Sequence, residues 1–138
     1  MKFTTLGILS LAFLSACEAK STEDTSSSND TPNFEVINLT VTSAECNDEE
    51  PPEESLYVYV NSESVVQVSH SNVLSSACLN FDVEASLDGN DVNLSYIEVG
   101  EPCDCTSTYT LAYDIQGLES GIFRLQLPGN MTEDVNIQ

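Results

Sequence analysis

The stretch NFDVEASLDGNDVNLSY, residues 80–96, decides the fold class of this chain. Apolar side chains recur at every second position over residues 81–87 and again over residues 92–96. A period of two is that of a strand with one buried and one solvated face. The polar segment between the two runs, Asp88–Asp91, contains Gly89 and has the composition of a tight turn. The stretch therefore predicts two antiparallel strands joined by a hairpin.

The same alternation extends over most of the chain on either side of this hairpin. Residues 109–115 and 123–127 alternate in the same way, and shorter apolar patterns predict three more strands, at residues 37–41, 56–60 and 66–68. Turn residues lie between the predicted strands, at Asn61–Glu63 and, between the last two, at Gly117–Gly121. Helical periodicity is not sustained over three turns anywhere. About seven short strands predict an all-β fold, an antiparallel two-sheet sandwich.

The first 16 residues have the composition of a signal peptide. Lys2 supplies a positive charge, and residues 3–16 are mostly apolar and end in the small residue Ala16. A membrane-spanning helix needs about 20 predominantly apolar residues, and this segment turns polar at Glu18. We therefore expect residues 1–16 to be a signal peptide; a transmembrane anchor is the weaker alternative.

The four residues Leu14-Ser15-Ala16-Cys17 resemble the lipobox of bacterial lipoproteins. The resemblance implies that the Cys17 thiol receives a diacylglycerol, that the signal peptide is cut before Cys17, and that the new amino group is acylated, as with palmitate. Two or more acyl chains anchor a protein stably to a membrane. Glu18 differs from the Asp associated with inner-membrane retention, which favours the outer membrane. The alternative is an ordinary secretory signal with a chance cysteine.

Residues 17–33 are expected to form a flexible acidic, Ser-rich tether that starts at the lipidated cysteine. After Cys17 the segment contains no large apolar side chain up to residue 33, so it has no surface to bury that would offset the entropy of ordering. The predicted domain organisation is a signal peptide at residues 1–16, the tether at residues 17–33, and a β-sandwich domain at residues 34–138.

The chain is strongly acidic. It has 23 Asp and Glu residues against three Lys and Arg, a formal net charge of −20, and removal of the signal peptide leaves only Lys20 and Arg124 as basic residues. Such a surface repels phosphate backbones, which argues against nucleic acid as a partner. It also disfavours docking on anionic lipid beyond the covalent anchor. Cations, basic partners and simple solubility remain open.

A second resemblance covers residues 65–127. Residues 113–123, YDIQGLESGIF, resemble the closing segment of many extracellular immunoglobulin-like and prealbumin-like modules. Together with His70-Ser71-Asn72 and the spacing of Cys78 from Cys103-Asp104-Cys105, the region looks like a class of small, uncharacterised bacterial lipoproteins. The resemblance implies an immunoglobulin-like sandwich at the cell envelope and carries no activity.

Four cysteines remain besides the one in the lipobox: Cys46, Cys78, Cys103 and Cys105. An even number in a small exported domain predicts two disulfides. A direct Cys103–Cys105 bridge would close a very small, strained ring. We prefer Cys78–Cys105 with Cys46–Cys103, by a narrow margin over the exchanged pairing.

Metal-binding alternatives compete with these assignments. His70 with Cys78, Cys103 and Cys105 has the ligand types of a zinc or copper site, but the spacing is not that of Cys-x-x-Cys knuckles. A lone histidine is more often a structural hydrogen-bonding group. The acidic run Asp48–Glu54 contains two prolines and lacks an EF-hand pattern, which favours a solvated loop over a calcium site. We predict no metal site, cofactor or catalytic residue.

These observations predict a membrane-tethered module of the cell envelope rather than an enzyme. Its function is expected to be non-enzymatic, either structural or in binding an envelope protein or an extracellular ligand. The alternative is an extracytoplasmic metal-binding module that uses calcium, zinc or copper.

Overall fold

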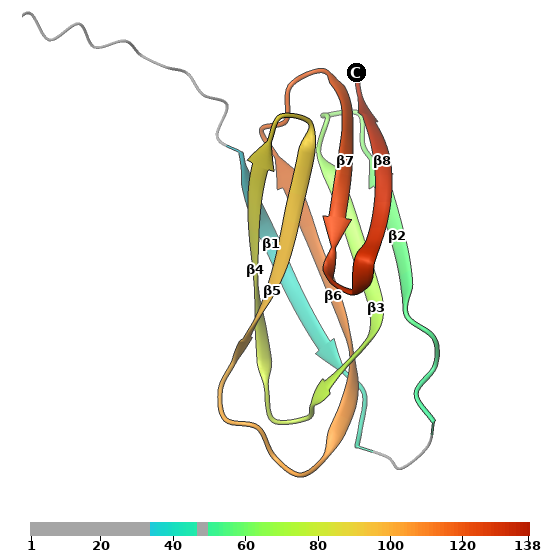
Figure 1. Cartoon of the computed structure of the whole chain (residues 1–138), viewed down its shortest axis with the longest axis vertical. Coiled ribbons are helices and arrows are strands. Elements are labelled where there is room, and N and C mark those ends of the chain that lie inside the picture. The colour runs from blue at the N-terminus through green and yellow to red at the C-terminus, as the bar shows by residue number, and fades with distance from the viewer. Residues whose placement is uncertain (1–33, 47–49) are drawn as a thin grey trace, which may run out of the picture.

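The computed structural model describes residues 34–46 and 50–138 (Figure 1). The predicted signal peptide, the lipidation site Cys17 and the tether lie outside these residues. The described chain forms eight strands and one turn of 3-10 helix: β1 (Glu35–Ser43), β2 (Ser55–Val60), β3 (Val66–Ser76), β4 (Asn80–Asp88), β5 (Asp91–Val99), β6 (Thr106–Gln116), β7 (Gly121–Leu127), η1 (Pro128–Asn130) and β8 (Met131–Ile137). In these residues no helix is long and apolar enough to cross a membrane.

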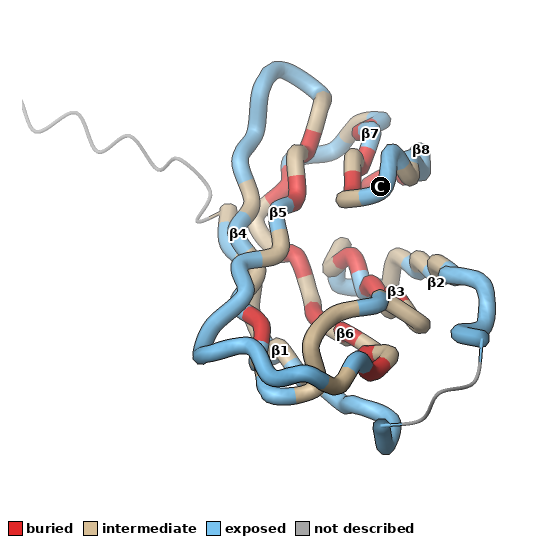
Figure 2. Tube along the Cα trace, turned by 60° about the horizontal axis from the view of Figure 1, so that its bottom comes forward, coloured by how far each residue is buried: buried red, intermediate tan, exposed pale blue. Residues whose placement is uncertain are grey.

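The strands form two four-stranded sheets that face each other, which confirms the predicted all-β sandwich. Sheet A has the order β1-β6-β3-β2 and sheet B the order β4-β5-β7-β8. Figure 2 shows the two layers apart, with buried residues on the faces between them. Sheet B is mixed rather than purely antiparallel, because β5 and β7 run parallel. They are parallel because the chain leaves sheet B after β5, runs through β6 in sheet A, and returns through the Gly117–Gly121 segment.

The eighth strand, β8, was not predicted. It pairs antiparallel with β7 and buries Val135 and Ile137, which are 5% and 3% exposed. In the sequence Glu133 interrupts the inward-facing residues of this strand. Only two apolar residues at alternate positions, Val135 and Ile137, follow it. The strand is defined by its partner β7, a long-range contact that a local pattern does not contain.

The core is built by the alternating residues that the sequence marks as apolar. Val66, Val92, Leu111, Ile115 and Leu125 are completely buried and come from β3 and β6 of sheet A and from β5 and β7 of sheet B. The Phe81 and Tyr109 rings meet edge to face across the sandwich, with centroids 4.9 Å apart. Burial of these side chains between the two sheets is the main stabilising contribution to the fold.

Both predicted hairpin turns are confirmed. Asp88 pairs with Asp91 at the β4–β5 turn, where Gly89 has φ +59°. At the β2–β3 turn the side-chain oxygen of Asn61 accepts hydrogen bonds from the backbone N–H groups of Glu63 and Val65. Asn61 therefore acts as the turn-forming residue that its chemistry predicts.

Two β-bulges shape sheet A, and each has an asparagine with positive φ. Asn38 in β1 has φ 56° and Asn72 in β3 has φ 64°, a conformation that asparagine tolerates better than most residues. The register of β3 shifts between His70 and Val73, which lie opposite Leu111 and Tyr109 of β6. The bulge thus allows His70 and Val73, three residues apart, to face the interior together.

Candidate functional site

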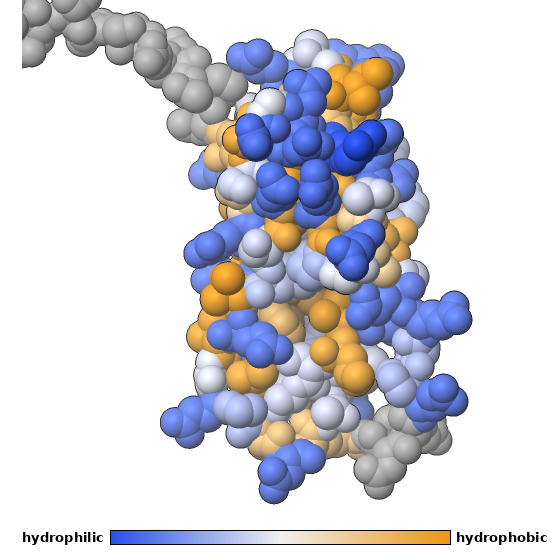
Figure 3. Space-filling view, in the orientation of Figure 1, coloured by the Kyte–Doolittle hydropathy of each residue, from blue (hydrophilic) through white to orange (hydrophobic). Residues whose placement is uncertain are grey.

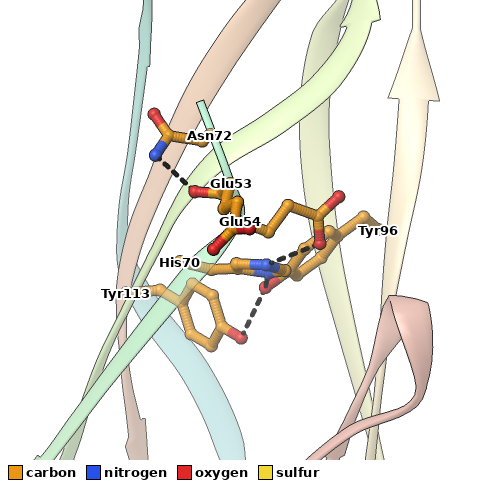
Figure 4. A network of polar contacts seen from close by, with 6 residues as sticks. All are labelled: Glu53, Glu54, His70, Asn72, Tyr96 and Tyr113. Carbon is orange, nitrogen blue, oxygen red and sulfur yellow. Dashed lines mark hydrogen bonds and ion pairs between the residues drawn. The ribbon is translucent and has the colours of Figure 1, made fainter. Parts of the chain in front are cut away.

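A chain of polar side chains crosses the interior of the sandwich (Figure 4). It joins His70 of β3 and Tyr113 of β6, both in sheet A, to Tyr96 of β5 in sheet B. His70 Nδ1 lies 2.9 Å from the Tyr96 hydroxyl, and that hydroxyl lies 3.2 Å from the hydroxyl of Tyr113. His70 and Tyr113 are 1% and 2% exposed, so this polar chain is part of the core.

Glu54, just before β2, lies at the outer end of this chain of side chains. Its Oε2 is 3.3 Å from His70 Nε2, within the distance of an ion pair, and its side chain is 38% exposed. The pair lacks the alignment of a hydrogen bond, which leaves His70 Nε2 as the one buried side-chain polar atom without such a bond in residues 34–46 and 50–138. Glu54 therefore covers the imidazole from the outside, with its carboxylate facing Nε2.

Two other elements lie next to Glu54. The side-chain amide of Asn72, at the β3 bulge, donates a 2.8 Å hydrogen bond to the Glu53 carbonyl. On the other side, a Cβ atom added to Gly129 of η1 would lie 3.4 Å from Glu54 Oε2. The β3 bulge thus holds the backbone next to Glu54, and glycine at position 129 leaves room for the carboxylate over His70.

Burial sets the protonation states of this cluster. Desolvation lowers the pKa of His70 below its usual 6.5, and this effect outweighs the nearby Glu54 carboxylate, which raises it. Burial raises the pKa of Tyr96 to about 12 and raises the pKa of Tyr113 as well. At neutral pH all three groups are uncharged. Tyr113 can then donate to Tyr96 and Tyr96 to Nδ1 of the imidazole, with the N–H on Nε2 facing Glu54.

This arrangement supports a structural role for His70. Its Nδ1 and the two tyrosine hydroxyls hydrogen-bond with one another between the sheets, as most buried polar groups do, while Nε2 faces the Glu54 carboxylate. A general base has to come within hydrogen-bonding reach of a substrate. The buried His70 and Tyr113 are closed off from such contact, and the position of Glu54 covers the remaining imidazole nitrogen. The single histidine makes the hydrogen bond that a structural role requires, to Tyr96, and that role stays a prediction.

Sequence reasoning missed the partners of His70. Tyr96 and Tyr113 lie on the predicted inward faces of their strands, and His70 has the same parity as Val66 and Val68. An imidazole and two hydroxyl groups on inward faces that are otherwise apolar need hydrogen-bonding partners in the core. Their contact with one another could therefore have been predicted. Glu54 carries no comparable signal, because it belongs to an acidic run.

The four cysteines of the sandwich form two disulfides, as predicted, but the preferred pairing is wrong. The bridges are Cys46–Cys105 and Cys78–Cys103, with Cα–Cα distances of 6.1 and 5.6 Å. β6 lies between β1 and β3, so Cys105 at its start is near the ends of both strands, and the position of Cys103 beside β3 leaves Cys105 to Cys46, which follows β1. The Cys103 N–H donates to the hydroxyl of Ser76 at the end of β3, close to Cys78.

The pairing removes the proposed zinc or copper site. All four sulfurs are used in bridges, so none is a thiolate ligand to join His70. Over the described parts of the chain, no three His, Cys, Asp or Glu side chains gather around a point that could hold a metal ion. Of the acidic run, Asp48 and Glu49 lie outside the described residues, Glu50 and Glu53 are exposed, and Glu54 contacts His70.

Comparisons with known proteins found no match: no family model, curated protein or solved structure resembles this chain closely enough to be assigned. The resemblance to small bacterial lipoproteins with an immunoglobulin-like domain therefore stays a prediction.

Proposed function

We propose that this protein is a lipoprotein of the bacterial cell envelope, anchored in the outer membrane through Cys17, and that its β-sandwich is a non-enzymatic binding or structural module. One observation carries the proposal. The chain has five cysteines, and the two disulfides use the four that lie in the sandwich. The fifth, Cys17, is the cysteine of the Leu-Ser-Ala-Cys motif, and lipidation is a chemistry that requires an unpaired thiol.

The disulfides also support the compartment. Disulfides persist in oxidising, extracytoplasmic environments and are rare in the cytosol. The first strand, β1, begins at Glu35, so a polar segment of moderate length separates Cys17 from the sandwich. A lipid at Cys17 would then hold the domain near the membrane while leaving its surface accessible to partners.

The buried state of the His70 cluster supports a non-enzymatic role. The single histidine and its tyrosine partners are occupied in joining the two sheets, and the hollows on the described surface are shallow. Such a molecule offers surfaces for binding rather than a cleft that encloses a substrate.

The anchor can be tested with the full chain expressed in a Gram-negative host and fed a labelled fatty acid. The wild-type protein and the matched control Ser15→Ala, which keeps a small residue in the motif, should carry the label and fractionate with the outer membrane. Cys17→Ser should be unlabelled and should keep the mass of the precursor. A Cys17→Ser protein that is still processed and still membrane-bound would contradict the proposal.

A further inference from the structure

The outer face of sheet A differs in charge from the rest of this acidic molecule. The alternating strand residues that face away from sheet B are uncharged except for Glu35 and Asp114, and none is basic. Both carboxylates accept hydrogen bonds from neighbouring amides: Glu35 from Gln116, and Asp114 from Asn38 at 2.8 Å. The chain has 23 acidic residues, but the strand positions of this face carry only two carboxylates, and each accepts a hydrogen bond from an amide.

The outer face of sheet B shows the contrast. Figure 3 views the molecule from that side, and hydrophilic residues cover much of it over β7 and β8. Its exposed strand positions include Asp82, Glu84 and the exposed ion pair between Arg124 and Asp134. The absence of charged clusters from the sheet A face is thus a property of that face and not of the whole described surface.

A shallow hollow of about 290 Å³ lies on this face, and Asp114 is the one charged residue in its lining. Tyr57 of β2, Ser69 of β3 and Ala112 of β6 are neighbours in the register, so a large ring is followed across the sheet by two small side chains. The small side chains form the floor, and the Asn38–Asp114 pair at the β1 bulge forms the opposite wall. The volume is just below the range of about 300–1,000 Å³ that is usual for small-molecule sites.

Tyr57 of the edge strand β2 borders the hollow, and Tyr59 follows it on the same strand outside the hollow. The exposed fractions are 67% for Tyr57 and 50% for Tyr59, and the two rings are two residues apart on the same face. An aromatic ring offers a large apolar surface that is costly to leave in water. Next to the rings lie an amide, Gln67, and a hydroxyl, Ser69, which can donate and accept hydrogen bonds.

We propose that this face binds a neutral saccharide, with Tyr57 as its stacking platform. The C–H face of a sugar ring packs on an aromatic ring, and adjacent hydroxyls can pair with the planar carboxylate and amide groups of Asp114 and Asn38. This inference names the ligand class of the binding module proposed above and rests on that role. It does not depend on the lipid anchor.

Charge argues against three other classes of partner. An anionic ligand finds no cation on the face and is repelled by a net charge of −20. A basic peptide finds only carboxylates that already accept amide hydrogen bonds, while other surfaces offer unpaired ones. A second copy of the chain would add an equal negative charge. A neutral polyol encounters none of these penalties.

The test uses the full chain purified in detergent, and affinity electrophoresis through gels containing neutral polysaccharides: a β-glucan, an α-glucan, a mannan, a galactan and a chitin derivative. Polygalacturonate serves as the anionic comparison. At least one neutral polymer should retard the wild-type protein. Tyr57→Ala should weaken that binding about tenfold or more, and titration calorimetry with the matching hexasaccharide should give the same ratio.

The control is Ile122→Ala, which removes an apolar side chain that is 62% exposed on sheet B and should leave binding unchanged. Asp114→Asn, which retains the planar shape, should also weaken binding, and thermal melting of each variant checks its folding. The proposal is overturned if no neutral polymer retards the protein, if Tyr57→Ala binds normally, or if Tyr57→Ala instead dissociates a dimer. Fatty-acid labelling at Cys17 is measured separately, so failure here leaves the anchor unaffected.

Discussion

At position 70 the chain places its only histidine on an otherwise apolar face, between Val68 and Val73. The position is tolerable because Tyr96 brings a hydroxyl from the opposite sheet to 2.9 Å from Nδ1. An unpaired imidazole there would cost on the order of 1–3 kcal/mol, so the histidine and the tyrosine stabilise the fold only together. The residue is better understood as half of a contact between sheets than as an isolated polar group.

The lowered pKa of His70 predicts that acid destabilises the fold through this residue. As the pH falls below about 6.5, the unfolded chain binds a proton at His70 while the folded chain does not, because burial disfavours the imidazolium. The free energy of unfolding contributed by this residue is therefore fully present above about pH 6.5 and is lost as the pH falls through the lower folded pKa.

Urea denaturation of the wild-type protein and of His70→Gln, between about pH 7.5 and pH 5, isolates this effect. The difference in stability between them should shrink as the pH falls, because only the wild-type protein carries the histidine penalty. A constant or growing difference would mean that Glu54 stabilises a charged imidazole in the folded state, contrary to the balance that burial imposes.

At the scale of elements, the sequence predicts strands wherever the inward residues form an uninterrupted apolar series. β4, β5 and β6 satisfy this condition, and their hairpin and turn residues fix where they begin and end. β8 fails it because Glu133 lies within its inward series, and its burial depends on pairing with β7. The predicted disulfide pairing was wrong for a related reason: β6 lies between β1 and β3, which places Cys105 near the ends of both strands, and a local pattern contains no strand order.

The two disulfides connect elements over different lengths of chain, which predicts unequal contributions to stability. Cys46–Cys105 spans 59 residues and Cys78–Cys103 spans 25. In the chain-entropy view, removing them costs about 4 and about 3.5 kcal/mol respectively, because the longer loop restricts the unfolded chain more. The double variants Cys46→Ser/Cys105→Ser and Cys78→Ser/Cys103→Ser, compared by guanidinium denaturation, measure that order.

Single variants check the pairing itself. Cys46→Ser should leave Cys105 open to alkylation while Cys78 and Cys103 stay protected in peptide maps of the unreduced protein. Alkylation of Cys103 instead would show that Cys46 pairs with Cys103, as the sequence analysis preferred. The cysteine replacements also separate stability from anchoring, since Cys17 is unchanged in all of them.

At the scale of the whole molecule, charge is the dominant feature, because 23 acidic residues share the chain with three basic ones. The described domain contains a single arginine, Arg124. Both side chains of its ion pair with Asp134 are exposed, so the pair offsets little of the repulsion among the carboxylates. Acidic side chains are instead spread over loops and outer faces, while the outer face of sheet A is left nearly neutral. This distribution of charge leaves most of the surface strongly solvated. It makes the outer face of sheet A the face on which an uncharged partner would meet the fewest charges.

This imbalance predicts that salt stabilises the protein. Mutual repulsion of the carboxylates is relieved on unfolding, and raising sodium chloride from about 0.01 M to 1 M shortens the screening length from roughly 30 Å to 3 Å. The melting temperature should therefore rise with salt. Calcium and magnesium at the same ionic strength should raise it equally, because screening does not distinguish the two ions, whereas a site of several convergent oxygens would favour calcium. A melting temperature that rises further with calcium than with magnesium would show that acidic residues converge on an ion, and it would return the metal-binding alternative to consideration.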